Sequence, residues 1–113
     1  MMRDEYISFA KETKINAFVV DIIDDVNVGY ASPLMEKESP TSFRHANNSV
    51  DAYKEAITKL KDNGFYVIGR ITAFKDTYYV QDNKDKAITN SSGSPLKHQS
   101  SFWPSAFNRD VWE

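Results

Sequence analysis

The chain contains no cysteine, which excludes disulfides and metal sites with thiolate ligands. No apolar run approaches the roughly 18 residues that a membrane-spanning helix needs, so no membrane partner is expected. The first ten residues lack the apolar core of a signal peptide. A parent protein whose own start lies upstream of Met1 could still be exported, so the sequence leaves the compartment open.

The chain also lacks an excess of charge of either sign. The chain has 14 lysines and arginines, scattered without a stripe, against 16 acidic residues. A net charge of -2 argues against a dedicated nucleic-acid binder. The two histidines, His45 and His98, lack ligand spacing, and no glycine-rich phosphate loop or nucleophile motif is present. No metal or other cofactor is therefore expected.

The most informative pattern is a strand, a helix and a second strand. Residues 17–23 are almost entirely apolar, with Asp21 the one exception, and residues 65–72 form a similar run. Between them, residues 50–60 place their apolar side chains on one helical face, with Ser49 or Asn48 as the N-cap and Gly64 as the C-terminal glycine. This pattern predicts an α/β fold with a βαβ unit whose two parallel strands are buried on both faces.

The remaining segments are less regular. Residues 4–14 are predicted to be helical, and residues 24–48 are predicted to form a long loop punctuated by glycine and proline. A short helix is expected at residues 76–83, and residues 90–95 are expected to form a hairpin turn flanked by Ile88 and Leu96. Asn108 is the expected N-cap of a helix that starts at Arg109.

Several of these segments resemble a family of glycoside hydrolase-like (β/α)₈ barrels known as a domain of unknown function. Asn16-Ala17 with the apolar strand and the acidic residues 21–25 resembles the second strand of that family. Arg70-Ile71 with Phe74-Lys75-Asp76 resembles its third strand, and Trp103 with residues 108–113 resembles the segment that opens its third helix. Lys59, Leu60 and residues 64–68 fit the same register. Two departures are Thr77, where a proline is usual, and Ser105-Ala106, where Asp or Asn followed by proline is usual.

The resemblance implies a partial TIM (β/α)₈ barrel, with residues 1–113 as a single partial domain that runs from the first helix to the start of the third. It also implies acid–base hydrolysis of glycosidic bonds in polysaccharides or cell-wall glycans. Because barrel glycosidases usually take their acid and nucleophile from later strands, the principal carboxylates are expected outside this chain. The isolated chain is therefore expected to be inactive.

Asp21 and Arg70 are the leading candidate site residues. Each is a charge near the carboxyl end of an apolar strand, and a charge in such a place needs a partner. They are interpreted either as a structural ion pair in the barrel mouth or as a pair in which Arg70 orients a sugar hydroxyl or a catalytic carboxylate. The two interpretations are compatible.

Five further residues are candidates for substrate binding or for its support: Asp24, Asp25, Lys75, Asp76 and Trp103. Adjacent acids in an extended chain point to opposite faces, so Asp24 and Asp25 are poorly placed to act together as a glycosidase pair. They could instead be solvated loop acids. Asp76 could cap the short helix that follows it, and Trp103 could stack on a sugar or anchor its loop.

A rival hypothesis from another class is a non-catalytic carbohydrate-binding or self-assembling module. A two-stranded parallel sheet leaves both edges bare, so homo-oligomerisation through these edges is expected.

Overall fold

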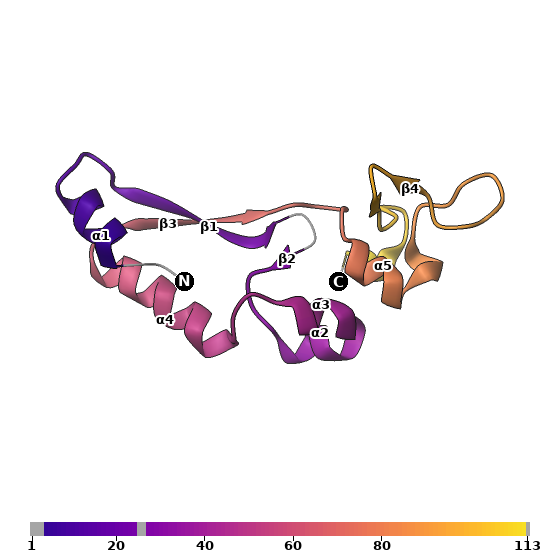
Figure 1. The fold of residues 1–113 in the computed structure, drawn as a ribbon, viewed down its shortest axis with the longest axis horizontal. Helices are drawn as coiled ribbons and strands as arrows, with labels where there is room; N and C mark the ends of the chain where they lie inside the picture. Colours follow the sequence, from indigo (N-terminus) through magenta and orange to yellow (C-terminus); the bar gives the residue numbers. More distant parts are fainter. Residues whose placement is uncertain (1–3, 25–26, 113) are drawn as a thin grey trace.

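The structure is a computed structural model that describes residues 4–24 and 27–112. Its centre is a pair of parallel strands, β1 (Ala17–Asp24) and β3 (Tyr66–Ile71), joined by the crossover helix α4 (Val50–Asp62) (Figure 1). The register places Val19 opposite Ile68 and Asp21 opposite Arg70. The predicted βαβ unit is therefore confirmed.

Helix α4 begins and ends at the predicted residues. The Ser49 hydroxyl accepts a hydrogen bond from the Ala52 amide at 3.2 Å, which is the N-cap contact. At the other end, Gly64 has φ +84°, a left-handed conformation that glycine adopts without the steric cost of a Cβ. These two residues set the length of the crossover and bring the chain back to β3.

The sheet has a third strand that was not predicted. Strand β2 (Asn27–Val28) pairs antiparallel with β1, giving the order β2-β1-β3 and a mixed rather than wholly parallel sheet. Gly29 makes this return possible, because a Cβ there would lie 2.6 Å from the Asp21 carbonyl oxygen. The register of β1 also shifts between Asp21 and Ile23, which is a bulge directly after the predicted site residue.

The core lies on one face of this sheet. Helix α1 (Asp4–Lys11), three residues shorter than predicted, packs against α4 and the start of β3. Four buried side chains form the centre of the cluster, with Phe18, Val20 and Val67 packed against it: Ile7, Ala10, Leu60 and Phe65. Because side chains alternate along a strand, the residues directly before and after Val20 and Val67 point to the opposite face of the sheet.

That opposite face is open, so the prediction of strands buried on both faces was wrong for the described residues. Val19 is 57% exposed and Ile68 is 46% exposed. The described helices α1 and α4 pack on the other side of β1 and β3 (Figure 1). The apolar runs correctly predicted strands with two apolar faces. Only one of these faces is covered by other described residues.

The predicted long loop at residues 24–48 was also wrong. It contains β2 and two short helices, α2 (Pro33–Glu38) and α3 (Pro40–His45). Both helices start with proline at their first position, where the missing N–H is no loss, and Ser32 caps α2 by accepting from the Met35 amide at 3.1 Å. The prolines that suggested a loop are helix starts.

The segment after β3 largely matches its prediction. Asp76 caps a short helix, and the Leu96 amide donates to the Ile88 carbonyl at 2.7 Å across the predicted hairpin turn. Asn108 caps a 3₁₀ turn rather than a longer helix. The described elements of this segment are α5 (Thr77–Asp82), η1 (Lys84–Lys86), β4 (Lys97–His98), β5 (Ser101–Phe102) and η2 (Arg109–Val111).

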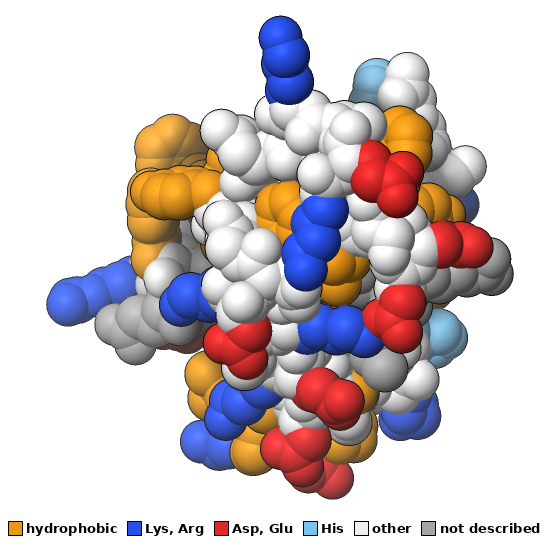
Figure 2. Space-filling view, turned by 90° about the vertical axis from the view of Figure 1, so that its left-hand side faces the viewer, with side chains coloured by type: hydrophobic (Ala, Val, Ile, Leu, Met, Phe, Trp, Pro, Cys, Tyr) orange, Lys and Arg blue, Asp and Glu red, His pale blue; other side chains and the backbone are white. Residues whose placement is uncertain are grey.

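The molecule is elongated. It measures 56 × 26 × 23 Å, and its radius of gyration of 16.9 Å exceeds the roughly 13 Å of a compact domain of this length. The α1–α4 core lies at the amino end of the sheet, while α2, α3 and α5 gather at its carboxyl end (Figure 1). At the amino end, acidic and basic side chains are interspersed, and hydrophobic side chains gather along one side (Figure 2). The fold is mixed α/β, with a mixed sheet that includes parallel strands.

Candidate functional site

Asp21 and Arg70 form a two-pronged ion pair on the open face of the sheet. The Arg70 Nε donates to Asp21 Oδ1 at 2.5 Å, and Nη2 donates to Oδ2 at 2.9 Å. This bidentate geometry fixes the plane of the guanidinium. The hydrogen bonds and charge of Asp21, with a smaller contribution from Asp24, raise the pKa of Arg70 above its ordinary value. The structure thus brings together the two residues predicted to be partners.

The neighbouring acids are placed less centrally. Asp24 is the exposed last residue of β1, and Asp25 lies outside the described residues. Across the described chain, no group of three histidine or acidic side chains could hold a metal ion. His45 instead stacks on Tyr78, with ring centroids 4.3 Å apart. None of the described helices is long and apolar enough to cross a membrane.

Lys75 and Asp76 follow the carboxyl end of β3. Asp76 Oδ1 accepts from the Tyr79 amide at 2.9 Å, so this carboxylate is the N-cap of α5. Burial raises the pKa of Asp76, against the opposing effect of the Tyr79 and Tyr78 amides. A raised pKa is a property of general acids, but the capping contact is sufficient to explain its position.

Trp103, the aromatic candidate from the sequence, lies beneath Lys75. The Lys75 ammonium is 5.8 Å from the centroid of the indole ring, a distance that allows a cation–π contact. Its ring nitrogen is buried and has no hydrogen-bond partner among the described residues. Trp103 is therefore in contact with a predicted site residue, but its ring is largely enclosed by protein.

Two connected clefts open at the carboxyl end of the sheet. We name the larger one, of about 610 Å³, the α2–α5 cleft, because it lies between α2 on one side and α5 with η2 on the other. The smaller β3-end cleft, of about 370 Å³, follows the last residues of β1 and β3. Both are lined by Ile23, Asp76, Tyr79 and Val111, so the two clefts adjoin, and we call them together the carboxyl-end depression. Their sizes are in the range of small-ligand sites.

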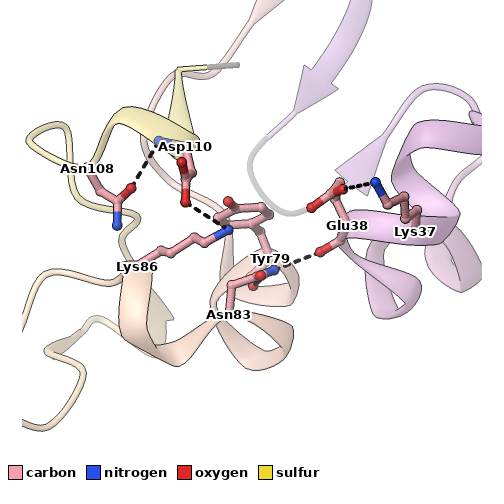
Figure 3. Close-up of polar contacts among 7 residues, drawn as sticks. All are labelled: Lys37, Glu38, Tyr79, Asn83, Lys86, Asn108 and Asp110. Carbon is pink, nitrogen blue, oxygen red and sulfur yellow. Dashed lines mark hydrogen bonds and ion pairs between the residues drawn. The ribbon is translucent and has the colours of Figure 1, made fainter.

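The α2–α5 cleft is lined by charged groups that the sequence did not indicate. Glu38 comes from α2, while Lys86 and Asp110 face it from η1 and η2 (Figure 3). The Lys86 ammonium lies 3.5 Å from an Asp110 oxygen, and the Asn83 side chain donates to the Glu38 carbonyl at 2.8 Å. These residues lie far apart in the sequence, and only the packing of α2 near α5 brings them together.

The protonation of the cleft residues gives it both donors and acceptors. Burial raises the pKa of the Tyr79 hydroxyl. Burial lowers the pKa of Lys86, but the Tyr79 phenolate, which forms only at high pH, and the Asp110 carboxylate outweigh this effect and raise the pKa overall. Both groups therefore keep their protons at neutral pH and can donate, while the carboxylates of Glu38 and Asp110 accept. Such a surface suits a ligand rich in hydroxyl groups.

Asp82 holds the two walls of the α2–α5 cleft together. Its carboxylate, at the end of α5, accepts from the Thr41 amide and hydroxyl at 2.8 Å each and from the Ser39 hydroxyl at 3.0 Å. It thus supplies the N-cap contact that Ser39 does not make for α3. Desolvation opposes ionisation, but these three hydrogen bonds lower the pKa of Asp82 below its ordinary value.

Phe74 has a backbone conformation that is uncommon for a bulky residue. Its φ of +57° lies in the left-handed region, which costs about 1–2 kcal/mol for an L-residue with a Cβ. Its ring contacts Trp112 edge-on, with centroids 5.2 Å apart, and both rings line the β3-end cleft. The sequence analysis did not indicate this pairing.

Comparison with known proteins agrees with the resemblance seen in the sequence. A family model described as a putative glycosyl hydrolase domain matches residues 1–113, so the chain belongs to that family. The chain is also similar to the crystal structure of a hypothetical protein from Ruminiclostridium thermocellum ATCC 27405, at 30% sequence identity and a TM-score of 0.78. The match covers 96% of this chain and 56% of that protein, so the chain spans little more than half of its length. No curated protein matches the chain.

Proposed function

We propose that this member of the glycosyl hydrolase-like family contributes two neighbouring strands to a (β/α)₈ barrel, and that its carboxyl-end depression binds a polysaccharide or cell-wall glycan. The observation that carries the proposal is the Asp21–Arg70 pair on the uncovered sheet face, because Ile23 and Ile71, which follow the pair on β1 and β3, line the β3-end cleft. In barrels of this type, active sites lie at the carboxyl ends of the strands.

The distribution of side chains on the open face supports the barrel. Toward the amino end it carries the exposed apolar residues Val19 and Ile68, and toward the carboxyl end it carries the charged pair. An interior of apolar layers topped by a polar mouth has the same order. Exposed apolar side chains of this kind need cover, which additional strands of a barrel would supply.

The proposed role of Arg70 is to present a fixed, charged donor to a sugar hydroxyl or to a catalytic carboxylate. Asp21 orients the guanidinium through two of its five N–H groups, which leaves donors for a ligand. Asp24, Lys75 and Asp76 are proposed as further groups around the bound glycan. The principal catalytic carboxylates are proposed to come from other strands, so the chain alone binds and does not hydrolyse.

Calorimetric titration tests this proposal with three soluble probes: cellohexaose, chitohexaose and xylohexaose. Arg70→Met is expected to weaken binding of the preferred probe about tenfold, because the side chain keeps an unbranched apolar stem but loses all donors. Lys61→Met, which removes a positive charge from the exposed end of α4, is the matched control and should leave affinity unchanged. Equal affinity of Arg70→Met and wild type would contradict the proposed role of the pair.

The second candidate function is a self-assembling module that binds carbohydrate without chemistry. It is favoured by the same bare face and by the outer edge of β3, which pairs with no other described strand and could accept a strand from a second copy. Light scattering coupled to size exclusion measures the mass of the chain in solution. A dimer that binds oligosaccharide without releasing reducing ends supports this function, and a monomer at all concentrations speaks against it.

A further inference from the structure

The mouth of the β3-end cleft carries an aromatic pair that the Asp21–Arg70 site does not use. Phe74 and Trp112 meet edge to face, with ring centroids 5.2 Å apart and ring planes at 68°. Trp112 is 67% exposed, which is unusual for the residue type with the largest apolar surface. The pair therefore presents a large aromatic surface at the edge of a cavity.

The orientation of Trp112 is fixed by its own polar atom. The indole nitrogen donates to the Ala106 carbonyl at 2.8 Å. Because the single donor of the indole is occupied, what the ring offers to a ligand is its π surface. The exposed ring is thus held in place and available for stacking.

The backbone of Phe74 points to the same conclusion. Its left-handed φ of +57° is strained for a phenylalanine, and such strain persists where the surroundings enforce it, often at ligand sites. A glycine there would relieve the strain, so the presence of an aromatic side chain calls for a role of the ring. Its contact with Trp112 at the cleft mouth is one such role.

Charged groups lie next to this aromatic surface. Lys75 and Asp76 line the same cleft of about 370 Å³. A carboxylate has about four acceptor sites, and two backbone amides of α5 approach that of Asp76, so it can still accept from a ligand. A wholly apolar ligand would leave the remaining acceptor sites of this carboxylate buried and unpaired. A ligand with an apolar face and a polar rim satisfies both surfaces.

We propose that Phe74 and Trp112 form a stacking platform for one pyranose ring of the glycan, with Lys75 and Asp76 hydrogen-bonding to its hydroxyls. One face of a pyranose is a patch of C–H groups, whose partial positive charge suits the negative face of an aromatic ring. Its equatorial hydroxyls would point outward to the charged groups. This inference rests on the proposed function, because it names a subsite of the same depression.

Two single-tryptophan variants provide the test. Trp103→Phe leaves Trp112 as the reporter, and it is expected to fold because the buried Trp103 nitrogen makes no hydrogen bond among the described residues. Trp112→Phe leaves Trp103 as the reporter. On titration with cellohexaose, chitohexaose or xylohexaose, the emission of Trp112 is expected to change to saturation, while that of Trp103 changes far less.

Affinity gives the second readout. Trp112→Ala and Phe74→Gly are each expected to weaken binding about tenfold, and in Phe74→Gly the relief of the left-handed strain offsets part of the stability that is lost with the half-buried ring. Unchanged affinity in both variants overturns the platform and leaves the proposed function standing. The same conclusion follows if the emission of Trp112 does not change while the NMR signal of the Arg70 amide shifts. No binding of any probe to wild type overturns both.

Discussion

The Asp21–Arg70 pair makes a prediction about free energy that follows from its exposure. Its side chains are 36% and 60% exposed, respectively, so water competes with the bidentate contact. Two unit charges about 4 Å apart in water gain only about 1 kcal/mol, and ordering two side chains consumes part of it. A double-mutant cycle with Asp21→Ala and Arg70→Ala is therefore expected to give a coupling energy of about 0.5–1 kcal/mol.

The assay is urea unfolding of the four proteins, repeated over a tenfold range of protein concentration. The exposed Asp4–Lys59 ion pair, which joins α1 to α4, is the matched control and should give a coupling of the same size. A coupling of about 3 kcal/mol or more for Asp21–Arg70 at every concentration would refute the reasoning, because only a desolvated pair is expected to reach it. A coupling that grows with concentration would mean that a second copy covers the face.

Three further predictions concern single residues and are measured by urea unfolding. Asp82→Ala is expected to lower the free energy of unfolding by about 1–2 kcal/mol at pH 7, with Glu55→Ala on α4 as the control. Because the pKa of Asp82 is lowered in the folded protein, its contribution to the free energy of unfolding is present above the pKa of the unfolded state and is lost as pH falls through the folded pKa. A difference between Asp82→Ala and wild type that does not change with pH would contradict this. Asp76→Asn keeps an N-cap acceptor without the buried charge, so this variant should be more stable than wild type at pH 7. Because the pKa of Asp76 is raised in the folded protein, the gain in stability should vanish when the pH falls below the pKa of the unfolded state. Gly64→Ala should lower the free energy of unfolding by about 1 kcal/mol because of the φ of +84° alone, since a Cβ there meets no atom within 4 Å. An unchanged free energy of unfolding would exclude that backbone conformation.

The central unit could be predicted from the sequence because local signals agree there. Ser49 and Gly64 delimit α4, and the two apolar runs on either side have the length and composition of strands. The pairing of Asp21 with Arg70 followed from their equivalent positions near the ends of neighbouring strands. Each of these inferences needed only residues within one element or one crossover.

The walls of the clefts could not be predicted in the same way. Helices α2 and α3 have six residues each, too short for a periodic pattern, and their prolines also suit a loop. Glu38 faces Lys86 and Asp110 only because Asp82 joins α5 to the start of α3, a tertiary contact without a local signature. Likewise, nothing in the sequence near Phe74 indicates a left-handed backbone.

The most direct test of the glycan site is an NMR titration of the ¹⁵N-labelled chain with cellohexaose, chitohexaose and xylohexaose. One probe is expected to shift amide signals at the carboxyl end of the sheet, around Asp21, Arg70 and residues 74–76, and to leave the α1–α4 core unchanged. Shifts confined to the core end near Leu60, or no shift with any probe at millimolar concentration, would contradict the account.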